Sequence, residues 1–267
     1  MGVLNITPDS FSDGGEFYRD GAICLQQVVA RATAMAAQGA KVLDVGGEST
    51  RPGAAPVTVQ EELQRVIPVV EALLELDIIV SVDTRHGLVA QAAIDAGAHL
   101  INDVGAGADE DMLRIVAATG VGYALMHMQG SPQNMQDAPS YADVVGEVRQ
   151  FLASRVAQCR RAGVGAEHLL IDPGFGFGKT TAHNLTLLAC LEDIRVDDLP
   201  ILVGLSRKRT IGAVTGREVN ERVYGSVAAA LLAAERGANL VRVHDVAATM
   251  DLLKLLQAVQ EQLPGSG

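Results

Sequence analysis

Four polar side chains of this sequence lie at or inside the ends of short apolar runs, and their types could bind a ligand. Asp83 closes the run IIVSVD, Asn102 lies in LINDV, and Asp172 lies in LLIDPG. Lys208 stands two residues after the run ILVGLS. Buried carboxylates and amides require hydrogen-bonding partners. A ligand rich in N–H and carbonyl groups would satisfy two aspartates, one asparagine and one lysine at once.

Arg51, Arg242 and His244 form a second candidate group, which is cationic. Arg51 follows the run VLDVG, and the other two lie in the run LVRVHD. Guanidinium groups bind phosphate through paired hydrogen bonds, and a chain of net charge −11 needs such a local cluster to hold an anion. The alternative is structural, because ion-pair networks give similar patterns. In that case the two arginines would pair with the neighbouring carboxylates of Glu48, Asp44 and Asp245.

The stretch IDPGFGFGKT (171–180) resembles a nucleotide phosphate loop at first sight. Its spacing does not fit, because Gly174 and Gly178 are one residue too close for GxxxxGK[ST] and position 173 is proline. We therefore interpret Asp172 as a ligand anchor and the glycines as a flexible turn beside it.

A regular scaffold must position these residues. Short β-branched runs predict eight strands, at residues 3–7, 42–46, 78–83, 100–104, 123–128, 169–174, 201–206 and 240–245. Apolar residues at helical spacing predict helices between them, clearest at 58–76, at 143–157 and from 246 to 259. Thr58 and Glu61 form a capping-box pattern, and Pro68 is the residue expected to kink that helix. Helix C-caps are expected at five glycines, namely Gly39, Gly97, Gly120, Gly163 and Gly237.

Eight strands alternating with helices predict an α/β protein with a single domain over residues 1–267, a (β/α)8 TIM barrel. A doubly wound open sheet uses the same alternation and is the alternative. In a barrel the chemistry lies at the carboxyl ends of the strands, which is where the polar residues above are found.

Composition narrows the class of protein further. The net charge argues against a general binder of nucleic acid or anionic membrane, and the longest uninterrupted apolar runs are far short of a membrane span. The three cysteines form no CxxC pair and are odd in number, so a reducing cytoplasm is expected.

Three segments are more specific than a TIM barrel alone requires: GVLNITPDSFSDGG (2–15), GGESTRPG (46–53) and IDPGFGFGKT. Together with SVDT, INDV, GLSRK and VRVHD they closely resemble the dihydropteroate synthase family of folate biosynthesis, in order and along essentially the whole chain. The resemblance implies a transferase that joins 6-hydroxymethyl-7,8-dihydropterin diphosphate to 4-aminobenzoate. The products would be 7,8-dihydropteroate and diphosphate.

The same resemblance implies roles for individual residues. The pterin ring would be held by Asp83, Asn102, Asp172 and Lys208. The diphosphate would be held by Thr50, Arg51, Arg242 and His244, with Asn5 helping to ligate Mg²⁺. The aminobenzoate pocket would be formed by Thr50, Arg51, Pro52, Phe177, Ser206 and Lys208. A lid over the site would include Asp9, Ser10, Phe11, Ser12 and Asp13. The reaction itself would depend on Asp83, Asp172, Lys208 and Arg242.

This chemistry suits the residue types. Loss of diphosphate leaves a cation spread over the pterin, which aspartates stabilise electrostatically, while Mg²⁺ and arginines neutralise the leaving group. A neutral arylamine attacks without a Ser–His–Asp relay. Sulfonamides would compete with 4-aminobenzoate, and a homodimer is expected as in the family. Two alternatives remain: a pterin-binding methyltransferase that serves a corrinoid, and a barrel without activity.

Overall fold

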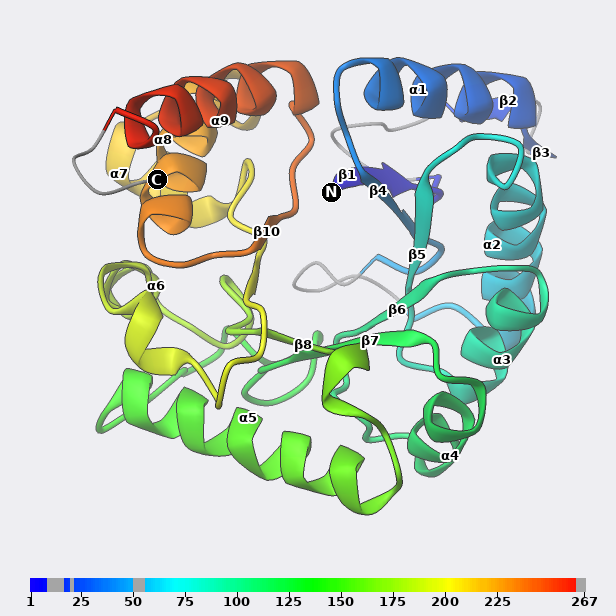
Figure 1. The fold of residues 1–267 in the computed structure, drawn as a ribbon, viewed down its shortest axis with the longest axis horizontal. Coiled ribbons are helices and arrows are strands. Elements are labelled where there is room, and N and C mark those ends of the chain that lie inside the picture. The colour runs from blue at the N-terminus through cyan, green and yellow to red at the C-terminus, as the bar shows by residue number, and fades with distance from the viewer. Residues whose placement is uncertain (9–16, 20–21, 50–55, 263–267) are drawn as a thin grey trace.

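Eight parallel strands form the centre of the computed structural model, which describes residues 1–8, 17–19, 22–49 and 56–262. They are β1 (Gly2–Asn5), β4 (Val42–Gly46), β5 (Ile79–Asp83), β6 (Leu100–Asp103), β7 (Gly122–Met126), β8 (Leu169–Asp172), β9 (Leu202–Val203) and β10 (Leu240–Val241). The first six form one sheet in the order β1-β4-β5-β6-β7-β8, and β9 pairs with β10. Helices surround the strands when the molecule is viewed as in Figure 1.

Two isolated parallel bridges close this arrangement into a barrel. Ile171 in β8 bridges to Ile201, and Gly2 in β1 bridges to Val243. The β9–β10 pair therefore fills the gap between the two edges of the six-stranded sheet. The fold is a TIM barrel, as the sequence predicts, and not the open doubly wound sheet.

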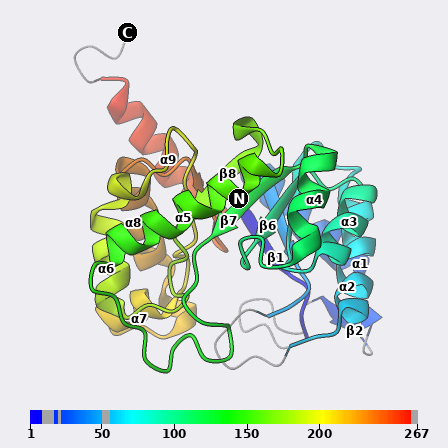
Figure 2. The ribbon, with the colours of Figure 1, turned by 90° about the horizontal axis from the view of Figure 1, so that it is seen from below.

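Helices follow the strands in the expected alternation. They are α1 (Leu25–Ala37), α2 (Val59–Leu73), α3 (Gly87–Asp95), α4 (Glu110–Thr119), α5 (Val144–Arg161), α6 (Thr181–Ala189), α7 (Arg209–Thr215), α8 (Val223–Glu235) and α9 (Val246–Gln260). Both views place α1 to α4 on one side of the strands and α6 to α9 on the other (Figures 1 and 2). None of the helices in the described part of the chain is long and apolar enough to cross a bilayer.

Local sequence signals account for the ends of these helices. Thr58 and Glu61 form the predicted reciprocal capping box at the start of α2, and Pro68 lies inside that helix. Positive φ angles occur at all five of the glycines predicted to end helices. Such angles are accessible to glycine because it has no Cβ.

Two features differ from the prediction. β9 and β10 form a regular ladder over two residues each, although both apolar runs are six residues long. Beyond these residues the two runs are joined by isolated backbone hydrogen bonds, such as the one from Arg242 N to Val203 O (2.9 Å). A short antiparallel hairpin, β2 (Tyr18–Arg19) with β3 (Ala22–Ile23), precedes α1 and is absent from the sequence-based prediction.

Side-chain alternation along the strands divides the barrel interior into two layers. The lower layer is apolar and consists of Met1, Val42, Leu100, Ala124 and Leu202, with Leu170 and Leu240 packed against it. Two residues further along the same strands the interior positions become polar: Asp44, Asn102, Asp172 and Arg242. The intervening residues, such as Leu43, Val45 and Ile101, are buried in the core beneath the helices. The alternation therefore directs the polar side chains to the carboxyl ends of the strands.

Candidate active site

Asp44 is the most highly connected acid of the barrel interior, and it is fully buried. Its Oδ1 accepts a hydrogen bond from Ser81 Oγ (2.6 Å). Its Oδ2 accepts from Asn102 Nδ2 (3.1 Å) and from Arg242 Nε (2.5 Å). These contacts join β4 to β5, β6 and the end of β10. Asp44 is absent from the predicted binding residues, although its position two residues before the end of β4 gives it the same inward direction as Asn102.

Arg242 bridges two carboxylates, since its Nη2 also donates to Asp83 Oδ2 at 2.9 Å. The structure thus places Arg242 in the ion pair with Asp44 that the sequence offers as the alternative to phosphate binding. The other acids offered as partners bind different arginines. Glu48 pairs with Arg85 at 3.0 Å, and Asp245 pairs with Arg207.

The four residues predicted to hold the pterin are brought to this end of the barrel. Asn102 and Asp172 are buried, whereas Asp83 and Lys208 are partly exposed. Burial raises the pKa of Asp83 to about 7, although the charge of Arg242 opposes the shift. Burial also raises the pKa of Asp172, against the charge of Lys208. Both carboxyl groups would gain from a ligand that donates hydrogen bonds to them.

Lys208 connects this set to the loop between β8 and α6. Its Nζ donates to the carbonyl oxygen of Phe175 at 2.5 Å and lies 4.7 Å from the centre of the Phe177 ring. Burial lowers the pKa of Lys208 to about 8, and the charge of Asp172 limits the shift. Two residues predicted for the aminobenzoate pocket, Phe177 and Lys208, are therefore in contact.

Ser206 and His244, predicted to serve different ligands, are also neighbours. The His244 backbone N–H donates to Ser206 Oγ (3.2 Å), and His244 Nδ1 lies 3.0 Å from the same hydroxyl. Because Ser206 follows β9 and His244 follows β10, this contact joins the carboxyl ends of the two short strands. The predicted diphosphate and aminobenzoate sites share a border here.

The glycines of IDPGFGFGKT are fixed by geometry, and their interpretation as a flexible turn is corrected here. Gly174, Gly176 and Gly178 have φ angles of 70°, 82° and 61°. An added Cβ at Gly174 would lie 1.8 Å from the His127 carbonyl oxygen, and one at Gly178 would lie 2.4 Å from that of Gln129. Close backbone contact therefore requires glycine at these two positions.

The loop after β4 is anchored by groups from α2 and from the loop after β5. Arg85 binds Glu48 with two hydrogen bonds of 3.0 Å, and Arg65 Nη1 donates to the Gly47 carbonyl oxygen at 2.8 Å. Gly47 itself lies against Val66 and Glu62 of α2. Thr50, Arg51 and Pro52 follow this anchored segment and lie outside the described residues, as do the predicted lid residues Asp9, Ser10, Phe11, Ser12 and Asp13.

Asn5 lies at the end of β1, beside Gly46 and Asp83. An ideal Cβ built on Gly46 would be 3.9 Å from both Asn5 Oδ1 and Asp83 Oδ2. Within the described ranges, no group of three or more His, Cys, Asp or Glu residues could hold a metal ion. A hard cation such as Mg²⁺ is commonly held by one or two protein oxygens together with substrate phosphates, and the single amide oxygen of Asn5 fits that mode of binding.

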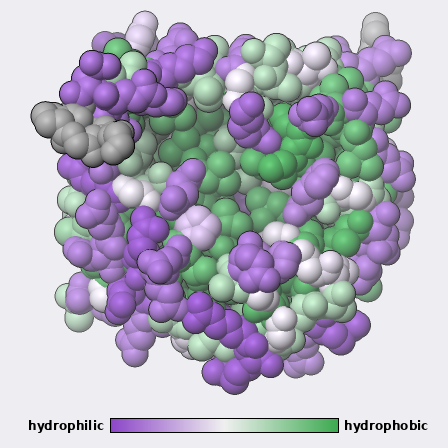
Figure 3. Space-filling view, viewed as in Figure 1, coloured by the Kyte–Doolittle hydropathy of each residue, from purple (hydrophilic) through white to green (hydrophobic). Residues whose placement is uncertain are grey.

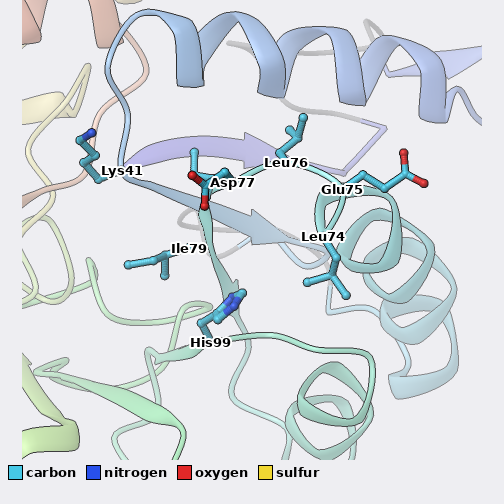
Figure 4. Close-up of a pocket in the computed structure, with 8 residues that line it drawn as sticks. Lys41, Leu74, Glu75, Leu76, Asp77, Ile79 and His99 are labelled. Atoms are coloured by element: carbon cyan, nitrogen blue, oxygen red, sulfur yellow. The ribbon is translucent and has the colours of Figure 1, made fainter.

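A cavity of about 650 Å³ lies at the opposite end of the barrel. Figure 4 shows its lining residues, which include Lys41, Ile79 and His99 at the amino ends of the strands. Catalytic residues of TIM barrels project from the carboxyl ends, so this cavity is distinct from the candidate site. In the orientation of Figure 1, apolar residues gather at the centre of the molecular surface within a hydrophilic rim (Figure 3).

Comparison with known proteins agrees with this fold and identifies the family. Residues 1–244 match the protein family described as pterin binding enzyme, and the chain belongs to this family. It is 48% identical over 259 residues to dihydropteroate synthase of Escherichia coli strain K12, covering 97% of this chain and 90% of the relative.

Solved structures of the same enzyme are also similar. Dihydropteroate synthase of Yersinia pestis, in complex with a sulfonamide drug, superposes with a TM-score of 0.93 at 46% identity, covering 98% of this chain and 94% of the other. The enzyme of Xanthomonas albilineans with 4-aminobenzoic acid gives a TM-score of 0.90 at 52% identity, with coverage of 99% and 93%.

Glu62 beneath the loop after β4 should make stability depend on pH. Its side chain is fully buried. Within the described part of the chain, neither carboxylate oxygen lies in hydrogen-bonding geometry with a donor. His86 Nε2 lies 3.9 Å away. Burial raises the pKa of Glu62 from 4.5 to about 7; the Glu48 charge adds to the shift, whereas the Thr84 side chain, Arg85 and Arg65 oppose it.

The folded protein therefore holds this proton more tightly than the unfolded chain. The associated stability is complete below pH 4.5 and is lost as the pH rises through about 7. Glu62→Gln should remove this dependence. The difference in free energy of unfolding between variant and wild type should therefore be about 3 kcal/mol more favourable to the variant at pH 8 than at pH 4. Urea unfolding at several pH values measures the difference, with Glu75→Gln at an exposed position as the control. A difference that stays constant with pH would contradict the assignment.

Proposed function

We propose that the protein condenses 6-hydroxymethyl-7,8-dihydropterin diphosphate with 4-aminobenzoate to give 7,8-dihydropteroate and diphosphate. The main support is the polar upper layer of the barrel, in which Asp83, Asn102 and Asp172 face the same end as Lys208. Relatives that match almost the whole chain are dihydropteroate synthases. The reaction transfers a pterin-methyl group and belongs to folate biosynthesis.

The pterin ring would bind over Asp83, Asn102, Asp172 and Lys208. Its N–H groups would donate to the two aspartates, whose pKa values burial raises. Hydrogen bonds that favour the ionised carboxylates would lower those pKa values again. Carboxylate charge beside the ring would then stabilise the cation that develops on it when diphosphate leaves.

The diphosphate would bind beside the ring, near Arg242 and His244, with Thr50 and Arg51 completing the group. Because Arg242 is held by Asp44 and Asp83, its guanidinium is fixed before substrate arrives. Pre-oriented charges lower a barrier without reorganising during the reaction. Arg242 would therefore link Asp83, which binds the pterin, to the leaving group.

Mg²⁺ would be held by Asn5 Oδ1 and the substrate's own phosphate oxygens. When bound, the ion would neutralise charge that develops on the departing diphosphate. Asn5 would place it at the corner of the mouth shared with Asp83 and Gly46.

The aminobenzoate would lie on the other side of the ring. Phe177 and Lys208 would form one wall and Ser206 another, with Thr50, Arg51 and Pro52 completing the pocket. The arylamine would attack the methylene carbon as diphosphate leaves, and its excess proton would pass to solvent or phosphate. A sulfonamide drug is bound in the Yersinia pestis relative, and a sulfonamide would compete for this pocket here. Closure of the segment with Asp9, Ser10, Phe11, Ser12 and Asp13 would exclude water from the cation.

A coupled assay tests the proposal directly. Purified protein with pterin diphosphate, 4-aminobenzoate and Mg²⁺ should release diphosphate and form dihydropteroate, and chelation of Mg²⁺ should slow both. Omitting 4-aminobenzoate is the control for simple hydrolysis. Absence of product at every enzyme concentration would reject the proposal. Transfer of a methyl group from a folate to a corrinoid would favour the methyltransferase alternative.

Two variants should separate ring binding from diphosphate binding. Asp172→Asn removes an acceptor of the ring and should weaken binding of both pterin diphosphate and the pterin without diphosphate by about tenfold or more. Arg242→Lys keeps a positive charge near Asp44 and Asp83 but loses the two-pronged guanidinium. It should therefore weaken binding of pterin diphosphate more than binding of the pterin without diphosphate. Calorimetry with both ligands measures the split, with exposed Asp251→Asn as the control. Equal losses in both variants would contradict this division of roles.

The proposed assembly is a homodimer, and the proposed compartment is the cytoplasm. Support for the dimer comes from large apolar side chains that are exposed on three neighbouring helices. α8 packs against both α7 and α9, and the exposed side chains are Val214, Tyr224, Leu232, Leu255 and Val259. Large exposed apolar side chains on neighbouring helices can serve as an association surface. Light scattering should give twice the mass of the chain, and Tyr224→Glu, at a residue 89% exposed, should shift it toward the monomer. A monomer in the wild type at all concentrations would reject the dimer.

A further inference from the structure

We infer that Lys179 is a positioning residue for the second substrate: it fixes the loop between β8 and α6 so that this loop presents the Phe175 carbonyl and the Phe177 ring to Lys208. The inference rests on the proposed function for its link to 4-aminobenzoate. Lys179 ends the GFGFGK stretch and is only 3% exposed. It lies within the loop, and its hydrogen bonds join the loop to His127.

The donors of Lys179 match the acceptors around it. Nζ lies 2.8 Å from His127 Nδ1, 2.9 Å from the Gly174 carbonyl oxygen and 3.0 Å from that of Phe177. An ammonium group has three N–H donors, so these three contacts use all of them. A fourth, longer contact of 3.3 Å reaches the His127 carbonyl oxygen. The ammonium thus ties both ends of the glycine-rich segment to the residue that follows β7.

His127 is the fixed partner in this arrangement. Burial, and then the charge of Lys179, lower the pKa of His127 to about 3. A neutral imidazole that accepts a hydrogen bond at Nδ1 carries its proton on Nε2. The ring is also held in place by an edge contact with Phe151 at 4.9 Å. Lys179 therefore favours one tautomer of a histidine that is only 5% exposed.

Close packing of the glycines and two further hydrogen bonds restrict the rest of the loop, so the contacts of Lys179 help to fix a single loop conformation. Gly174 and Gly178 approach the backbone of His127 and Gln129 too closely to admit a Cβ. Gly176 lies between them; its N–H donates to Asn184 Oδ1 (2.8 Å), and its carbonyl oxygen accepts from Gln136 (2.6 Å). The two residues that meet Lys208, Phe175 and Phe177, flank Gly176.

Electrostatics makes this lysine sensitive to its surroundings. Burial lowers the pKa of Lys179 to about 7; the charge of Asp172 opposes the shift, and that of Lys208 adds to it. A neutral amine would keep two N–H donors for three acceptors. One loop carbonyl would then lose its partner, or His127 would have to change tautomer. The loop conformation therefore favours the ammonium form, which the buried site otherwise disfavours.

Steady-state kinetics of Lys179→Met tests the inference, because methionine keeps much of the side-chain volume and has no N–H donors. We expect KM for 4-aminobenzoate to rise about tenfold while KM for pterin diphosphate changes less than about twofold. Lys179→Gln, which retains two donors, should give an intermediate value. It also serves as the test if the methionine variant does not fold. The control is Lys254→Met at an exposed position of α9.

A second readout does not depend on activity. Nitrogen NMR of histidine-labelled protein should show His127 as the Nε2–H tautomer in the wild type and a different Nδ1 shift in Lys179→Met. If the wild type forms no product, the proposed function fails and the NMR result alone decides the role of Lys179. Equal rises of both KM values, or an unchanged His127 signal, would overturn the inference and leave Lys179 a residue for stability alone.

Discussion

The bridge from Arg242 to Asp44 and Asp83 is the interaction on which the candidate site depends. Two carboxylates project into the same end of a barrel whose lower interior is apolar, and neither could be buried there without a partner. Arg242 supplies one hydrogen bond to each. Asp44 then holds Ser81 and Asn102 in place. One guanidinium thereby sets the relative positions of side chains from three strands, β4, β5 and β6.

The candidate site combines two structural supports of different kinds. Asp83, Asn102 and Asp172 come from strands, and their directions follow from the alternation that also builds the core. Phe177 comes from a loop whose conformation depends on glycines and on a buried lysine. Strand-borne groups suit a ligand of fixed shape such as a fused ring, because the sheet prevents them from moving independently. The loop-borne group meets the smaller, single-ring substrate.

Much of this arrangement can be predicted from the sequence. Alternation of short apolar runs with helical spacing predicts all eight strands and the barrel, and it places Asp83, Asn102, Asp172 and Lys208 together. The pairing of Arg242 could not be decided, because residue type alone does not distinguish a phosphate ligand from an ion pair. The contacts of Asp44 with Ser81 and Asn102, and the role of Lys179, were missed for a related reason. Each is defined by atoms that come from distant segments, and no local spacing reports such contacts. The short ladders of β9 and β10 likewise depend on barrel closure.

The closing of the barrel by two isolated bridges has a consequence for the order of folding. The six-stranded sheet ends at Asp172, so all of its strands leave the ribosome well before Arg242 does. Until β9 and β10 dock, the acids of β4 and β5 face each other without the guanidinium that later joins them. Docking of β9 and β10 brings Arg242 between Asp44 and Asp83, so the two carboxylates gain their shared cation only when the barrel closes.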